Sequence, residues 1–76
     1  MNTLPGIKLG GKGRVSGFEA GSKSYRRHLL SLGLTPGTEF QVTRIAPLGD
    51  PIEIRVRGTA ISLRKHEATV VLVDEI

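Results

Sequence analysis

Alternation of hydrophobic and polar residues with a period of two predicts most of the secondary structure of this chain. The clearest run covers residues 52–57, where isoleucine and valine alternate with glutamate and arginine, and the run 59–63 follows after Gly58. Two alternating runs that are separated by a glycine are typical of a β-hairpin. The residues expected on the core side of this hairpin are Ile52, Ile54, Val56, Ile61 and Leu63.

Residues 39–45 predict another strand, with Phe40 and Val42 on the core side. Strict alternation would place Arg44 on that same side, where an unpaired charge is costly to bury. A bulge or the end of the strand is therefore expected before Ile45.

Strands are also predicted near both ends of the chain. Residues 13–18 form a short first strand in which Gly17 is a bulge position. Residues 68–73 form the last strand, which is apolar on both faces and should therefore be central or face an interface. The stretch 64–67 before it is too short for a helix of its own and predicts a single 3₁₀ turn.

One short helix is predicted between the first strand and residue 39. Tyr25, Leu29 and Leu32 follow the i, i+4, i+7 spacing of one helix face, so this stripe should point inward. Ser22 or Ser24 can cap the start of the helix, because a serine side chain accepts a hydrogen bond from a free backbone N–H.

Gly33 and the pair Pro36–Gly37 predict how the chain leaves this helix. Gly33 occupies the place where helices commonly end with a left-handed residue. Residues 35–38 place proline and glycine at the two central positions of a type II turn, so Gly37 is expected to have a positive φ.

The length of 76 residues allows one domain, which the pattern divides into an arm and a barrel. Residues 1–12 are rich in glycine and show no periodicity, so they are expected to form a flexible or loosely docked arm. Residues 13–76 hold the predicted strands, with the helix inserted after the first. An open sheet of such strands would expose its edges, so a mainly β, closed or nearly closed small barrel is expected.

Cysteine and long apolar segments are both absent from the sequence. The lack of cysteine excludes disulfides and thiolate metal sites and fits a reducing compartment. No apolar run approaches the roughly 20 residues that cross a bilayer, and the N-terminus lacks the pattern of a secretory signal. A cytoplasmic protein that does not span a membrane is expected.

Eleven Lys and Arg residues against seven Asp and Glu residues give the chain a net charge of +4. This balance is compatible with an anionic partner, and a small nucleic-acid-binding barrel is one alternative reading of it. The basic residues are spread along the chain, however, and only three aromatic residues accompany them. Because single-strand binders stack bases on aromatic side chains, no nucleic acid partner is expected, and a salt-dependent mobility shift would test this.

Nothing in the sequence fills a catalytic role. Ser31 and Ser62 lack the Gly-x-Ser-x-Gly turn of a nucleophile, and His28 and His66 belong to no metalloenzyme pattern. The glycines of 10–13 are followed by no Gly-Lys-Ser/Thr phosphate loop. We expect no catalytic residues and no enzyme activity.

Two segments at a characteristic separation resemble the ferrous iron transport protein A (FeoA) family. The first is a helix end with the pattern Leu29-x-x-x-Gly33-Leu34-x-Pro36-Gly37, and the second is the loop 47–51, Pro-Leu-Gly-Asp-Pro. The resemblance extends over about residues 13–73. It implies a stand-alone SH3-like barrel of five or six strands with one short α-helix after the first strand.

The resemblance also implies a function and a partner. It implies a cytoplasmic accessory of ferrous iron uptake that acts by contact with the FeoB-type membrane transporter, with weak homo-oligomer formation as a further option. The residues expected to contact the partner are Arg26, Arg27, Leu30, Leu34, Pro36, Gly37, Leu48 and Asp50. The same barrel is similar to the C-terminal SH3-like domain of iron-dependent repressors, so a metal-responsive regulatory module is an alternative.

The link to iron calls for a search for metal ligands. Ferrous iron favours imidazole and carboxylate ligands, and zinc accepts them too. The candidates are His28, His66 and Glu67, with Glu19 and the pair 74–75 as further carboxylates. The expectation is no firm cofactor and weak binding of Fe²⁺ or Zn²⁺, the alternative being that these are ordinary surface groups.

Overall fold

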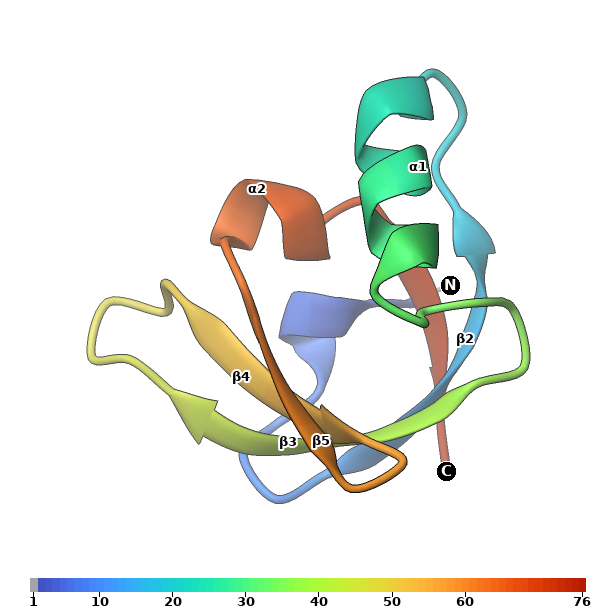
Figure 1. The fold of residues 1–76 in the computed structure, drawn as a ribbon. Helices are drawn as coiled ribbons and strands as arrows, with labels where there is room; N and C mark the ends of the chain where they lie inside the picture. Colours follow the sequence, from blue (N-terminus) through green and yellow to red (C-terminus); the bar gives the residue numbers. More distant parts are fainter. Residues whose placement is uncertain (1) are drawn as a thin grey trace.

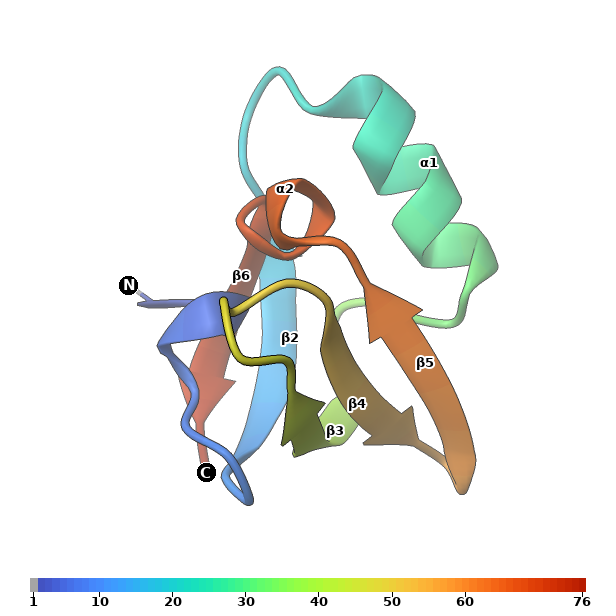
Figure 2. The same cartoon turned by 90° about the vertical axis from the view of Figure 1, so that its left-hand side faces the viewer.

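The computed structural model describes residues 2–76, and these form one antiparallel sheet of six strands with short helices (Figures 1 and 2). The strands are β1 (Asn2–Thr3), β2 (Lys12–Phe18), β3 (Glu39–Ile45), β4 (Ile52–Val56), β5 (Thr59–Leu63) and β6 (Val71–Glu75), in the sheet order β1-β6-β2-β3-β4-β5. The helices are η1 (Leu4–Gly6), α1 (Lys23–Ser31) and α2 (Lys65–Ala68). The strongly curved sheet encloses the core, and α1 and α2 lie at one end of it (Figures 1 and 2). The predicted mainly β barrel with one helix inserted near its start is confirmed, and the strand expected to be the first is β2, because the short β1 precedes it.

The hairpin β4–β5 forms as the alternation predicts. Its five expected core residues, Ile52, Ile54, Val56, Ile61 and Leu63, are all buried. Its turn consists of Arg57 and Gly58, both with positive φ (52° and 82°), which is the geometry of a two-residue type I′ turn.

The bulges predicted in the two long strands are also present. The register of β3 against β4 shifts between Val42 and Arg44, so Val42 is buried while Arg44 stays exposed. The register of β2 against β6 shifts between Val15 and Gly17. Each shift allows the residues after the bulge to change faces, so that strict alternation no longer decides which side chains lie on the core side.

The segment 1–12, expected to be a flexible or loosely docked arm, is built into the barrel over its described residues. β1 pairs with β6, and the side chains of Leu4 and Ile7 are buried in the core. The Gly10 N–H donates to the Val42 carbonyl at 2.8 Å. Two core residues in a short, aperiodic segment give no periodic signal, which is why the sequence pattern did not place them.

The region after β5 also differs from the expectation. Residues 64–67 do not form an isolated 3₁₀ turn, because Lys65–Ala68 form the short helix α2 and bury Ala68. The last strand therefore begins at Val71 rather than at Ala68. β6 lies between β1 and β2, which confirms that it is a central strand.

The helix α1 packs on the barrel through fewer buried residues than expected. Leu29 is fully buried and Leu32 is partly buried, as predicted. Tyr25 was expected to point inward, but it is 38% exposed, and its ring lies against the ring of His66 on α2. None of the helices among residues 2–76 has the length and apolar character that a membrane crossing requires.

Candidate partner-contact surface

The outward face of α1 carries basic and apolar groups together. Lys23, Arg26, Arg27 and Leu30 follow i, i+3, i+4, i+7 spacing, so they share one side of the helix, which does not include the buried Leu29. These four residues line a shallow hollow of about 290 Å³. Leu30 is 37% exposed, and the three basic groups make no ion pair within residues 2–76. We call these four residues the α1 surface.

Leu34, which was expected to contact the partner together with Leu30, is fully buried. The reason is the backbone at the end of α1: Gly33 has a φ of 96°, and the Leu34 N–H donates back to the Leu29 carbonyl at 3.1 Å. This Schellman-type ending directs the side chain of Leu34 into the core. Leu34 is therefore a packing residue and not a contact residue for a partner.

Pro36 and Gly37 form the predicted turn between α1 and β3. Gly37 has a φ of 91°, and the Thr38 N–H donates to the Thr35 carbonyl at 3.0 Å. Both residues are exposed, but the Gly37 N–H is committed to the Val15 carbonyl at 2.7 Å. Their observed contacts shape the chain, and contact with a partner stays a prediction.

The loop 46–51 contains the other two predicted contact residues. Leu48 is 91% exposed. Asp50 is bound to its own chain: its Oδ1 atom accepts the Lys65 N–H at 3.1 Å and lies 4.0 Å from the Arg64 guanidinium. In both overall views this loop lies on the other side of α2 from α1 (Figures 1 and 2). The predicted contact residues therefore belong to separate places on the molecule.

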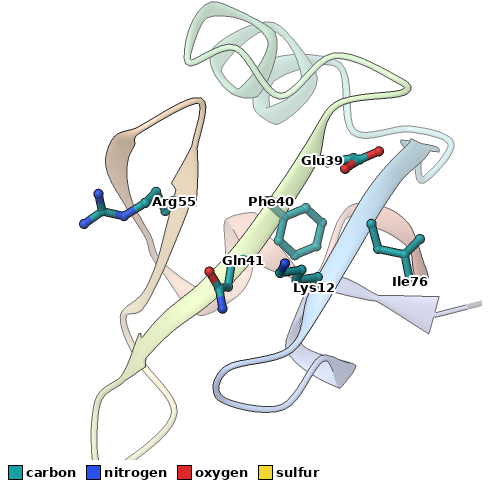
Figure 3. Close-up of a pocket in the computed structure, with 6 residues that line it drawn as sticks. All are labelled: Lys12, Glu39, Phe40, Gln41, Arg55 and Ile76. Carbon is teal, nitrogen blue, oxygen red and sulfur yellow. The ribbon is translucent and has the colours of Figure 1, made fainter.

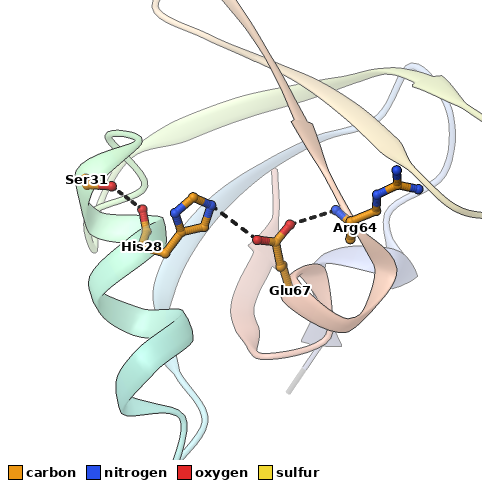
Figure 4. A network of polar contacts seen from close by, with 4 residues as sticks. All are labelled: His28, Ser31, Arg64 and Glu67. Atoms are coloured by element: carbon orange, nitrogen blue, oxygen red, sulfur yellow. Dashed lines mark hydrogen bonds and ion pairs between the residues drawn. The ribbon is translucent and has the colours of Figure 1, made fainter.

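The metal candidates are only partly brought together. The His28 Nε2 and Glu67 Oε2 atoms are 3.2 Å apart and join α1 to α2, while Glu67 Oε1 accepts the Arg64 N–H at 2.9 Å (Figure 4). His66 instead packs against Tyr25, with ring centroids 5.5 Å apart. Across residues 2–76, no three His, Cys, Asp or Glu side chains gather into a group that could hold a metal ion.

A further hollow of about 200 Å³ lies over β2, β3 and β4 and the C-terminus (Figure 3). It is lined by Lys12, Glu39, Phe40, Gln41, Arg55 and Ile76. The ring of Phe40 reaches this place because β2 carries Gly13 there: a Cβ atom at that position would lie 2.6 Å from Phe40 Cζ. No sequence signal marks the hollow, since its residues come from four separated segments and mix both charges.

Comparison with known proteins identifies the family. The FeoA domain model matches residues 2–75. A protein of Porphyromonas gingivalis, the Fe(2+) transport protein A/Fe(2+) transporter FeoB fusion protein, is 33% identical over 52 residues. That match covers 68% of this chain and only 6% of the fusion protein.

Solved structures show the same fold. An FeoA-like protein of Clostridium acetobutylicum is 38% identical, with a TM-score of 0.87 over 100% of this chain and 91% of that one. FeoA of Stenotrophomonas maltophilia, a prokaryotic SH3 domain protein in complex with zinc, is 28% identical, with a TM-score of 0.83 over 97% of this chain and 91% of that one. A manganese-dependent transcriptional repressor has a TM-score of 0.90 at 17% identity over 99% of this chain and 36% of that one, a likeness of fold alone. With a family match over nearly its whole length and the SH3-like fold of these proteins, this chain belongs to the FeoA domain family.

Proposed function

We propose that this chain is a cytoplasmic, non-enzymatic accessory protein of ferrous iron uptake that acts by contact with a FeoB-type membrane transporter. The observation that carries the proposal is the match of the FeoA domain to residues 2–75. The P. gingivalis relative supports the choice of partner, because there the two components share one polypeptide chain. Fusion holds two parts at a high effective concentration, as expected for parts that act in contact.

The contact is proposed to involve the α1 surface. Interfaces draw most of their energy from buried apolar anchors, while charges at the rim set the association rate and its salt dependence. Leu30 provides an exposed apolar group, and Lys23, Arg26 and Arg27 surround it with positive charge. An acidic face of the transporter would complement this surface. The accessory would act by binding one conformation of the transporter more tightly than another.

The substitution Leu30→Asp tests the apolar part of this contact. It should abolish capture of the detergent-solubilised transporter on immobilised protein, because it places a carboxylate in the centre of the apolar contact. The matched control is Leu9→Asp, at a leucine that is 60% exposed in another part of the chain. Circular dichroism should show both variants folded. Equal capture by a folded Leu30→Asp variant and by the control would contradict the proposed surface.

The basic part is tested by the double substitution Arg26→Glu and Arg27→Glu. It should weaken capture of the transporter more at low salt than at high salt, because at high salt the ions already screen the attraction between the two proteins. The double substitution Lys8→Glu and Lys12→Glu makes the same change of net charge away from α1. If both pairs weaken capture equally, net charge rather than the α1 surface steers the association.

Weak transition-metal binding is the second role that we propose, at the pair His28 and Glu67. One imidazole and one carboxylate 3.2 Å apart supply two ligand types that zinc and ferrous iron accept, with water completing the shell. The zinc complex of the S. maltophilia relative supports this choice of metal. Zinc titration followed by NMR should shift the His28 ring signals, and His28→Ala should abolish the response of Glu67. Zinc-induced shifts confined to other residues would refute this site.

A further inference from the structure

The two edges of the sheet differ in a way that points to a second interaction site. The strands at the edges are β1 and β5. β1 has only two residues, and a very short edge strand is a poor template for another chain. β5 has five residues, Thr-Ala-Ile-Ser-Leu, with no proline and no charged side chain to discourage pairing.

The hydrogen bonds of β5 are predictable residue by residue from the turn that precedes it. In a two-residue hairpin the residues that flank the turn, Val56 and Thr59, form a hydrogen-bonded pair. The antiparallel pattern then alternates, so Thr59, Ile61 and Leu63 bond to β4. The N–H and C=O groups of Ala60 and Ser62 point away from β4, and no hydrogen bond to a loop or turn of residues 2–76 engages them.

The side chains along this edge leave it open. Ala60 and Ser62 are both exposed, and both are small enough to let a neighbouring backbone approach to the usual interstrand spacing of about 4.8 Å. An extended peptide that paired with this edge would satisfy four backbone groups of β5. It would continue the sheet in the β-augmentation mode of peptide recognition.

The charges around the edge select the occupant. Arg57 lies at the start of the strand, Arg64 directly follows its end, and Arg55 lies opposite Ala60 on β4; all three are exposed. Of the two carboxylates nearby, Glu53, opposite Ser62, accepts a hydrogen bond from the Thr43 hydroxyl at 3.1 Å on the β3 side. Asp50 accepts the Lys65 N–H and also pairs with Arg64 at 4.0 Å, whereas Arg55 and Arg57 make no ion pair within residues 2–76.

We infer that β5 is a docking edge for an extended acidic segment of another protein, added to the sheet as a seventh strand. A second copy of this chain fits less well, because it would bring its own Arg55 and Arg57 to an edge that already carries both. The edge is distinct from the α1 surface, so the inference does not depend on the proposed function.

The test uses the full chain and a capped peptide in which glutamate alternates with valine, with lysine replacing glutamate in the control peptide. Hydrogen exchange followed by NMR should show the Ala60 and Ser62 amides protected by the acidic peptide and not by the basic one. Protection confined to α1, or equal protection by both peptides, would overturn the inference. Protection that grows with protein concentration in the absence of peptide would assign the edge to a second copy instead.

Variants test the edge directly. Ala60→Pro removes an N–H that does not bond to β4. It should lower the affinity for the acidic peptide by about tenfold, because one hydrogen bond to the peptide is lost and the proline ring hinders the approach of the peptide backbone. Ala60→Thr keeps the N–H and should retain binding. Arg57→Glu leaves the backbone of β5 unchanged and reverses one charge, so it should lower the affinity for the acidic peptide at low salt. This variant tests the inference even if Ala60→Pro does not fold. Unchanged affinity in a folded Ala60→Pro variant would also overturn the inference.

Discussion

At the scale of single residues, Asp50 has a structural task that its place in a family motif does not reveal. Its carboxylate reaches across to the first N–H of α2, Lys65, at 3.1 Å, and thereby fixes the loop 46–51 to the helix. The free N–H groups at a helix start need such an acceptor. This explains the acidic residue before Pro51 without any partner.

Asp50→Ala should therefore destabilise the protein by about 1 kcal/mol, the usual cost of losing a capping acceptor. Asp50→Asn retains the oxygen acceptor and should cost less, and urea denaturation would measure both. If the alanine variant is as stable as the parent but fails to bind the transporter, Asp50 is a contact residue and not a cap.

At the scale of elements, Glu67 of α2 both caps its own helix and connects it to α1. One carboxylate oxygen accepts the Arg64 N–H, which belongs to the start of α2, and the other faces His28 on α1 (Figure 4). The ring of Tyr25 against His66 adds a second contact between the same helices. The two helices are thus joined by side chains at one end of the barrel.

The two bonds of Glu67 can be separated by mutation. Glu67→Ala should lower the free energy of unfolding by about 1–2 kcal/mol, because the Arg64 N–H loses its acceptor and α2 loses its capping side chain. His28→Ala removes only a pair whose imidazole is 53% exposed, and should change the stability by no more than about 0.5 kcal/mol. Thermal denaturation of the two variants would check this order. Equal losses would mean that the pair with His28 carries the stability.

The elements show which parts of the fold a sequence pattern can predict. The hairpin β4–β5 and the bulge after Val42 were predictable because burial on one face forces a period of two. The helix α2 was not, since four residues carry too little periodicity and its start depends on Asp50, fifteen residues away. The same limit applies to the surface: Leu30 and Leu34 look alike in sequence, and only the reversal at Gly33 separates the exposed one from the buried one.

At the scale of the whole molecule, the core depends on its N-terminal segment. The segment 2–7 supplies Leu4 and Ile7, both essentially inaccessible to solvent. A domain of this length buries only about 60% of the surface of its unfolded chain, so each core side chain is a large share of its stability. The barrel therefore cannot be shortened to residues 13–76 without opening its core.

Leu4→Ala should destabilise the protein by about 2–5 kcal/mol, the usual range for a fully buried leucine. Leu9→Ala, at a leucine that is 60% exposed, should stay within about 0.5 kcal/mol of the parent. Guanidinium denaturation of both variants would measure the difference. Similar small losses in both would show that residues 1–12 form a loosely docked arm after all.

The central position of β6 has a consequence for the folding of the protein during translation. Residues 71–75 are synthesised after all the other strands of the sheet, yet they pair with residues 2–3 on one side and with β2 on the other, and they bury Val71 and Val73. Until they leave the exit tunnel, β1 has no neighbour and β2 lacks one of its two. The nascent chain can therefore form the local hairpin β4–β5 early, whereas the closed barrel must wait for translation to pass its final strand.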